Sequence, residues 1–146
     1  MEEINIENTV DLIHKKQAVF FSSQITLSSA FRVEKLKKLL KTIIQKEKEI
    51  HQALFKDLRK SSFESMTSET IFVEKEIRKM IRLLPSWIRP QRVQSSLLNF
   101  PSRDYIIPEP YGKTLLISPW NYPFQLAITP LVGAVAAGNT VVLKPS

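Results

Sequence analysis

The chain has 146 residues, of which 43% are hydrophobic and 24% are charged, a balance that predicts a globular domain rather than a disordered or membrane protein. Its formal charge of +7, from 21 lysines and arginines against 14 acidic residues, leaves nucleic acid, an anionic membrane surface or an anionic ligand open as partners. The absence of cysteine excludes disulfides, cysteine-ligated zinc and a cysteine nucleophile within these residues.

No targeting or membrane signal is visible in the chain. The first residues, Met1–Glu3, are acidic and precede no apolar run, and no apolar stretch reaches the roughly 18 residues of a membrane-spanning helix. The lysines lie mainly between Lys35 and Lys60 in a helical pattern with interspersed glutamates, which favours a solvated helix face over a nucleic-acid partner. The sequence therefore predicts a cytoplasmic, soluble protein with no nucleic-acid partner and no membrane segment.

The N-terminal part of the chain carries the spacing of amphipathic helices. Apolar residues recur at helical intervals from Ile6 to Phe20 and predict a first helix. A second apolar series runs from Leu36 to Leu58, and Glu47 interrupts it, which predicts either a kink or two helices. Serines between the two series offer N-terminal caps.

A capping box predicts the start of the next helix. Ser61 and Glu64 have the required spacing, and the apolar series that follows predicts a helix that ends at Pro85, because proline lacks a backbone N–H. His14 and His51 each stand alone on a predicted helix, without a second ligand at useful spacing. We therefore expect structural roles for both histidines and no metal site.

The pattern changes between Gln91 and Tyr111. Short apolar runs alternate there with Pro101, Pro108 and Pro110, which cannot donate to a central ladder and so predict edge strands and loops. The excursion is either a surface hairpin or an arm that pairs with another subunit, and the sequence leaves both open.

The last part of the chain predicts a strand, a helix and a second strand. Thr114–Ile117 is a continuous apolar run, as expected for a parallel strand buried on both faces. Pro123 suits the first turn of a helix, and Gly138–Asn139 ends that helix. Thr140–Leu143 forms the second strand, which should run parallel to the first.

These elements predict an α/β protein in which N-terminal helices precede the first strand–helix–strand unit of an open, incomplete parallel sheet. Within one domain over residues 1–146, we expect a helical part over 1–90, a strand and loop arm over 91–111, and the strand–helix–strand unit over 112–146.

Polar side chains follow the predicted strands where ligands of open parallel sheets bind, beyond the carboxyl ends. Ser118–Asn121 follows the first strand and Lys144–Ser146 ends the second. The Asn121 amide and the Lys144 ammonium could hold oxygen atoms of a ligand there. Alternatively, Asn121 only shapes the turn, Lys144 is solvated and Trp120 is ordinary packing.

The same segment resembles a known family. Ile117–Pro123 has the order Ile-Ser-Pro-Trp-Asn-Tyr-Pro, and it is followed by Gly133, Ala136–Asn139 and Val142–Ser146. This pattern and its spacing are similar to those of the aldehyde dehydrogenases, and the resemblance covers essentially the whole chain. The short N-terminus resembles the branch that acts on fatty and aromatic aldehydes. The resemblance implies a Rossmann-like sheet.

The resemblance also implies roles for individual residues. Asn121 would donate its amide to the oxyanion that forms when a thiolate attacks the aldehyde. Lys144 would reach the adenosine ribose of NAD, or a neighbouring phosphate of NADP, and Tyr122 would face the aldehyde tunnel. Four residues would line the cofactor cleft: Ile117, Ser118, Pro119 and Trp120.

Three parts of the family's machinery do not occur in these residues: the cysteine nucleophile, the general-base glutamate and the glycine-containing pyrophosphate turn. The resemblance therefore implies the N-terminal part of the cofactor-binding domain of a longer enzyme. That complete enzyme would oxidise an aldehyde to a carboxylic acid with NAD or NADP, as a homodimer. A truncated, noncatalytic interaction module is the alternative.

Overall fold

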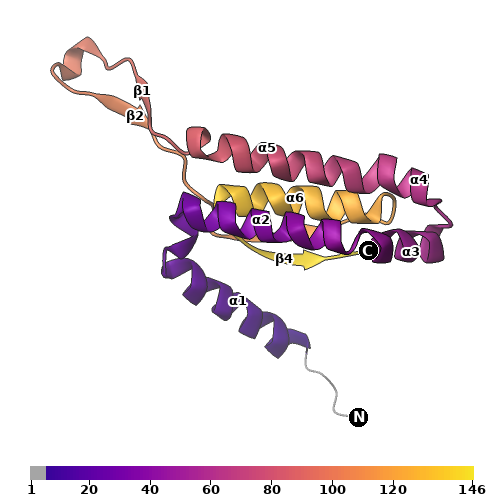
Figure 1. Ribbon diagram of the computed structural model, residues 1–146. Coiled ribbons are helices and arrows are strands. Elements are labelled where there is room, and N and C mark those ends of the chain that lie inside the picture. The colour runs from indigo at the N-terminus through magenta and orange to yellow at the C-terminus, as the bar shows by residue number, and fades with distance from the viewer. Residues whose placement is uncertain (1–5) are drawn as a thin grey trace.

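The computed structural model of the protein describes residues 6–146. The helices are α1 (Ile6–Ser22), α2 (Ser29–Gln45), α3 (Glu47–Leu58), α4 (Ser62–Ser65), α5 (Ile71–Trp87) and α6 (Pro123–Ala137). The strands are β1 (Gln91–Val93), β2 (Asp104–Ile106), β3 (Lys113–Ile117) and β4 (Thr140–Lys144). Short 3₁₀ turns lie at Ile25–Leu27 and Leu97–Asn99, and a π-helical segment at Met66–Thr70 joins α4 to α5. Figure 1 shows α2, α5 and α6 as a group of helices, with α1 apart from them.

Side-chain caps begin two of the helices as the sequence predicts. The Ser28 hydroxyl accepts a hydrogen bond from the backbone N–H of Phe31 at 3.3 Å, and that of Ser61 accepts one from Glu64 at 3.2 Å. The second apolar series is divided at Lys46, between α2 and α3, so the two-helix alternative is confirmed.

The helix that should end at Pro85 continues to Trp87, so this prediction is wrong. Pro85 lies in the last turn of α5, where its missing N–H removes one bond without ending the helix. The N–H of Ile88 still donates to the carbonyl of Leu84 at 3.2 Å, which closes the turn around the proline.

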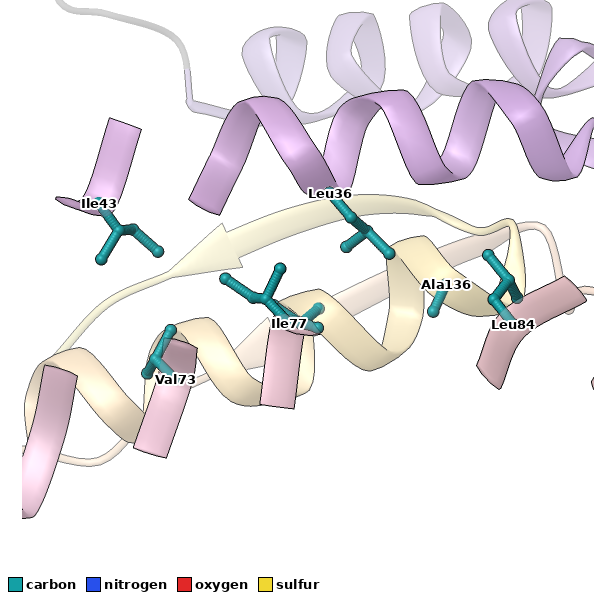
Figure 2. Close-up of a cluster of buried hydrophobic side chains, with 7 residues drawn as sticks. Leu36, Ile43, Val73, Ile77, Leu84 and Ala136 are labelled. Carbon is teal, nitrogen blue, oxygen red and sulfur yellow. The ribbon is translucent and has the colours of Figure 1, made fainter. Parts of the chain in front are cut away.

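The hydrophobic core lies where α2, α5 and α6 meet. Figure 2 shows side chains from the three helices converging on one cluster. The cluster consists of Leu36, Ile43, Val73, Ile77, Leu84, Val132 and Ala136. Leu36, Val73, Ile77 and Val132 are 0% exposed, and burial of such a side chain contributes about 1.5–3 kcal/mol. The other side of α6 contacts β3 and β4, which explains why α6 is apolar around most of its circumference.

β3 and β4 form a parallel pair whose register runs from Lys113 opposite Thr140 to Ile117 opposite Lys144. Helix α6 connects them, so the predicted strand–helix–strand unit is confirmed. The predicted burial of the first strand on both faces is wrong, because Leu115 is 62% and Ile117 is 70% exposed. Helix α6 packs on both strands, and His14 of α1 lies beside Lys113 at the start of β3, whereas Leu115 and Ile117 later in β3 stay exposed.

The segment between α5 and β3 forms an antiparallel hairpin. Gln91 pairs with Ile106 and Val93 with Asp104, and Figure 1 shows the hairpin projecting from the helices. Apolar residues are exposed along its tip: Leu97 is 92% and Leu98 is 95% exposed. The hairpin itself is therefore confirmed, whereas the choice between a free surface hairpin and an arm that pairs with another subunit stays a prediction. Among the described helices, none is long and apolar enough to cross a membrane.

Candidate functional site

The two segments that carry the predicted site residues meet at one edge of the strand pair. Ile117 and Lys144 are register partners at the ends of β3 and β4. The backbone N–H of Ser118 donates to the Lys144 carbonyl at 3.1 Å, and the Ser118 hydroxyl donates to the same oxygen at 3.4 Å. Ser118 is only 7% exposed. It therefore ties the start of the loop over 118–122 to the end of β4.

The loop after Ser118 presents its next side chains to solvent. Pro119 and Asn121 are exposed, and Trp120 is 73% exposed. Within residues 6–146, the Asn121 side chain makes no hydrogen bond, and the exposed Lys144 belongs to no ion pair. An amide that shaped the turn would bond to a nearby backbone group. Both the Asn121 amide and the Lys144 ammonium are thus exposed and unpaired within residues 6–146, and their roles toward a ligand stay predictions.

Tyr122 holds the conformation that joins the loop to α6. Its backbone is left-handed, with φ of 48° and ψ of 53°, and its side chain makes no capping hydrogen bond. This conformation costs roughly 1–2 kcal/mol for a residue with a Cβ, so the surroundings must fix it. The Lys60 Nζ lies 4.3 Å from the centroid of the Tyr122 ring, which is a cation–π contact.

A buried glutamate takes the place of the missing cap. Glu69 is 0% exposed, and its Oε2 accepts hydrogen bonds from the backbone N–H groups of Phe124 at 2.9 Å and Gln125 at 3.1 Å. Its Oε1 accepts from Lys60 Nζ at 2.5 Å. A carboxylate at a helix N-terminus also interacts favourably with the helix dipole. Glu69 therefore fixes the first turn of α6.

Glu69 is not among the site residues that the sequence predicts. A signal was present, because Glu69 lies four residues before the core residue Val73 and so on the apolar face of its helix. A carboxylate on a buried face requires a partner. The π-helical segment, which no motif predicted, brings Glu69 to α6.

The C-terminal end of α6 is held by a buried cation. Arg32 Nη1 donates to the carbonyl of Ala136 at 3.1 Å, while its Nε and Nη2 donate to the carbonyls of Thr26 at 2.5 Å and Leu27 at 3.1 Å. Burial lowers the pKa of Arg32 below its ordinary value. A positive charge suits this end of a helix. Charged side chains from the N-terminal helices thus hold α6 at both ends.

In the part of the chain that the structure describes, neither histidine belongs to a cluster of metal-ligating side chains. His14 Nε2 lies 2.8 Å from Lys113 Nζ, and His51 Nε2 lies 3.3 Å from the Thr70 hydroxyl. Over residues 6–146, no group of three or more histidine, aspartate or glutamate side chains could hold a metal ion. A cavity of about 230 Å³ lies at the C-terminal end of α6, beside Gly133 and Ala137, away from the loop that carries Asn121.

Two parallel strands joined by a helix are the building unit of nucleotide-binding α/β domains. The profile of the aldehyde dehydrogenase family matches residues 7–146, and the chain belongs to this family. The resemblance that rests on the Asn121 and Lys144 segments is thereby confirmed.

The chain is similar to several named members of the family. It is 45% identical over 127 residues to 4,4'-diaponeurosporen-aldehyde dehydrogenase of Staphylococcus aureus, and the matched region covers 87% of this chain and 28% of that protein. It is 45% identical over 126 residues to aldehyde dehydrogenase family 3 member B3 of Mus musculus, covering 86% and 26% respectively. A solved structure of Staphylococcus aureus AldH in a substrate-bound state has a TM-score of 0.91 and 42% identity, covering 94% of this chain and 30% of that one. The chain thus spans less than a third of the length of these relatives.

Proposed function

We propose that this chain supplies one wall of the active site of an NAD(P)-dependent aldehyde dehydrogenase, in which Asn121 is the oxyanion donor. Family membership supports the reaction class. The observation that carries the proposal is the exposed Asn121 amide, which has no partner in the described part of the chain and lies on a loop tied at both ends. A donor that is free of other bonds and held in place can stabilise charge that exists only during the reaction.

In the complete enzyme, the aldehyde, water and NAD(P)⁺ become the carboxylic acid, NAD(P)H and a proton. A cysteine thiolate outside these residues attacks the aldehyde carbon, and the carbonyl oxygen gains the negative charge. The Asn121 Nδ2–H donates to this oxygen. The chemistry that bound NAD(P)⁺ would supply is that of a hydride acceptor for this carbon. The acyl group is then released from the cysteine by water.

The residues at the strand edge fit a nucleotide. Ile117, Pro119 and Trp120 offer an exposed, mostly apolar surface to a base and ribose. The free Lys144 ammonium can donate to a ribose hydroxyl of NAD or to a neighbouring phosphate of NADP. Ser118 shapes the floor of the cleft rather than binding directly, since its donors are used by the Lys144 carbonyl.

Tyr122 borders the path of the aldehyde, since it follows Asn121 and the residue is 44% exposed. A homodimer is the proposed assembly of the complete enzyme, and the exposed apolar tip of the hairpin at Leu97 and Leu98 is the surface that an arm between subunits would use. The proposed location of the complete enzyme is the cytoplasm.

Aldehyde-dependent formation of NAD(P)H tests the reaction. We expect the complete enzyme to produce it with NAD, NADP or both, and we expect the 146-residue chain alone to produce none, because it contains no cysteine. Turnover by the short chain would contradict the proposed division of roles. A complete enzyme that oxidises no aldehyde with either cofactor would contradict the reaction class.

A further inference from the structure

We propose that Glu69 is a positioning residue for Asn121: its buried carboxylate fixes the start of α6 and, through it, the place of the Asn121 amide. This inference rests on the proposed function of Asn121. Glu69 is 0% exposed, so it does not touch the substrate. Its influence on the reaction must pass through the groups that it binds.

The two carboxylate oxygens have different partners. Oε2 accepts from the N–H groups of Phe124 and Gln125, at 2.9 and 3.1 Å, and Oε1 accepts from Lys60. The first N–H groups of a helix have no partner within the helix, and a side chain just before the helix normally serves them. Tyr122 occupies that position and makes no such bond. A residue distant in sequence thus performs the capping.

The loop between its two attachments is short. Ser118 is bonded to the end of β4, and Phe124 is bonded to Glu69, so only residues 119–123 lie between the fixed points. Pro119 and Pro123 restrict the backbone further, because their rings fix φ. Asn121 is at the centre of this segment. A shift of the first turn of α6 therefore moves the Asn121 amide.

The same carboxylate also governs the conformation of Tyr122. Glu69 holds the Lys60 ammonium, and that ammonium lies 4.3 Å from the centroid of the Tyr122 ring. The left-handed backbone of Tyr122 is unfavourable by itself and is stabilised from both sides: by the ring contact and by the fixed N–H groups that follow. Loss of the Glu69 charge weakens both supports.

Occupation of the helix N-terminus has a consequence for the chemistry. The N–H groups of Phe124 and Gln125, three and four residues after Asn121, would otherwise offer a second anion site at the start of α6. Glu69 uses both of them. The Asn121 side chain then remains the donor that this segment offers to the oxyanion, which makes its exact position more important.

A double-mutant cycle in the complete enzyme tests the proposal. Glu69→Gln keeps the size of the side chain but removes its charge, and it turns an NH₂ group toward donors. We expect the single-turnover rate of hydride transfer to fall by about 10- to 100-fold, as for a displaced catalytic group, with unchanged cofactor affinity. In an Asn121→Ala background, the same substitution should change the rate little, because its effect passes through Asn121.

Matched variants separate positioning from stability. Glu74→Gln removes a carboxylate that pairs with Arg78 at 3.3 Å on the surface of α5, and we expect an unchanged rate. If Glu69→Gln does not fold, the double variant Glu69→Gln with Lys60→Met removes both buried charges together and leaves no unpaired ammonium. It should show the same loss of rate and the same dependence on Asn121.

The outcomes are distinct. Two results would overturn the positioning role alone. One is a full rate for Glu69→Gln when Asn121→Ala lowers the rate. The other is an equal effect of Glu69→Gln on the rate with and without the Asn121 amide. An unchanged rate for Asn121→Ala would instead overturn the proposed function on which this role rests.

Discussion

Two glycines of the α6 segment should respond in opposite directions to the same substitution. Gly138 has φ of 93°, and a Cβ there would lie 2.7 Å from Cζ and Nη2 of Arg32. The Arg32 guanidinium cannot yield easily, because it donates to three backbone carbonyls. The conformation costs roughly 1–2 kcal/mol, and one buried carbonyl left unsatisfied costs about 1–3 kcal/mol. We expect Gly138→Ala to lower the free energy of unfolding by about 2–5 kcal/mol.

Gly133→Ala is the matched control. Apart from the two neighbouring residues and the backbone of α6 itself, no atom lies within 4 Å of a Cβ built at Gly133, which is inside α6. Alanine is the better helix former by about 0.5–1 kcal/mol, so this variant should be more stable than the parent. Urea denaturation of the 146-residue protein, monitored by the circular dichroism of its helices, measures the change in the free energy of unfolding for both variants. If Gly138→Ala were as harmless as Gly133→Ala, the proposed role of Arg32 at the C-terminal end of α6 would be wrong.

Two further predictions concern the strand edge. Lys144→Ala in the complete enzyme should raise the KM for the cofactor by about 10-fold and change the KM for the aldehyde less, because one charge-assisted hydrogen bond is lost. An unchanged KM for the cofactor would show that Lys144 is only a solvated lysine. The 146-residue chain should self-associate through the exposed face of β3, where Leu115 is 62% exposed, and Leu115→Lys should reduce this self-association. A monodisperse monomer of the unmodified chain in sedimentation velocity would refute the prediction.

Local patterns in the sequence predicted the elements that depend on local chemistry. The caps at Ser28 and Ser61 satisfy N–H groups three residues away, and the strand–helix–strand unit follows from an apolar run, a proline and a glycine in order. The convergence of Ser118 with Lys144 also followed, because parallel strands end at the same edge.

The missed features depend on contacts between distant segments. Glu69 accepts a hydrogen bond from the N–H of Phe124, which lies 55 positions later in the chain. The π-helical segment that contains Glu69 has no signature in the periodicity of the sequence. Arg32 reaches Ala136 across 104 positions. The exposure of Leu115 depends on what packs against its face of the sheet, whereas composition reports only that the strand is apolar.

The role of Asn121 is tested most directly by Asn121→Ala in the complete enzyme, with Asn139→Ala as its control. The Asn139 amide is structural, since its Oδ1 accepts from the N–H of Gly112 at 2.8 Å and the residue is 8% exposed. Asn121→Ala should slow single-turnover hydride transfer by roughly 10²–10³-fold, with unchanged Tm and cofactor affinity. Asn139→Ala should lower stability by about 1–3 kcal/mol and leave the rate nearly intact. A lowered Tm with an unchanged rate for Asn121→Ala would contradict the oxyanion assignment.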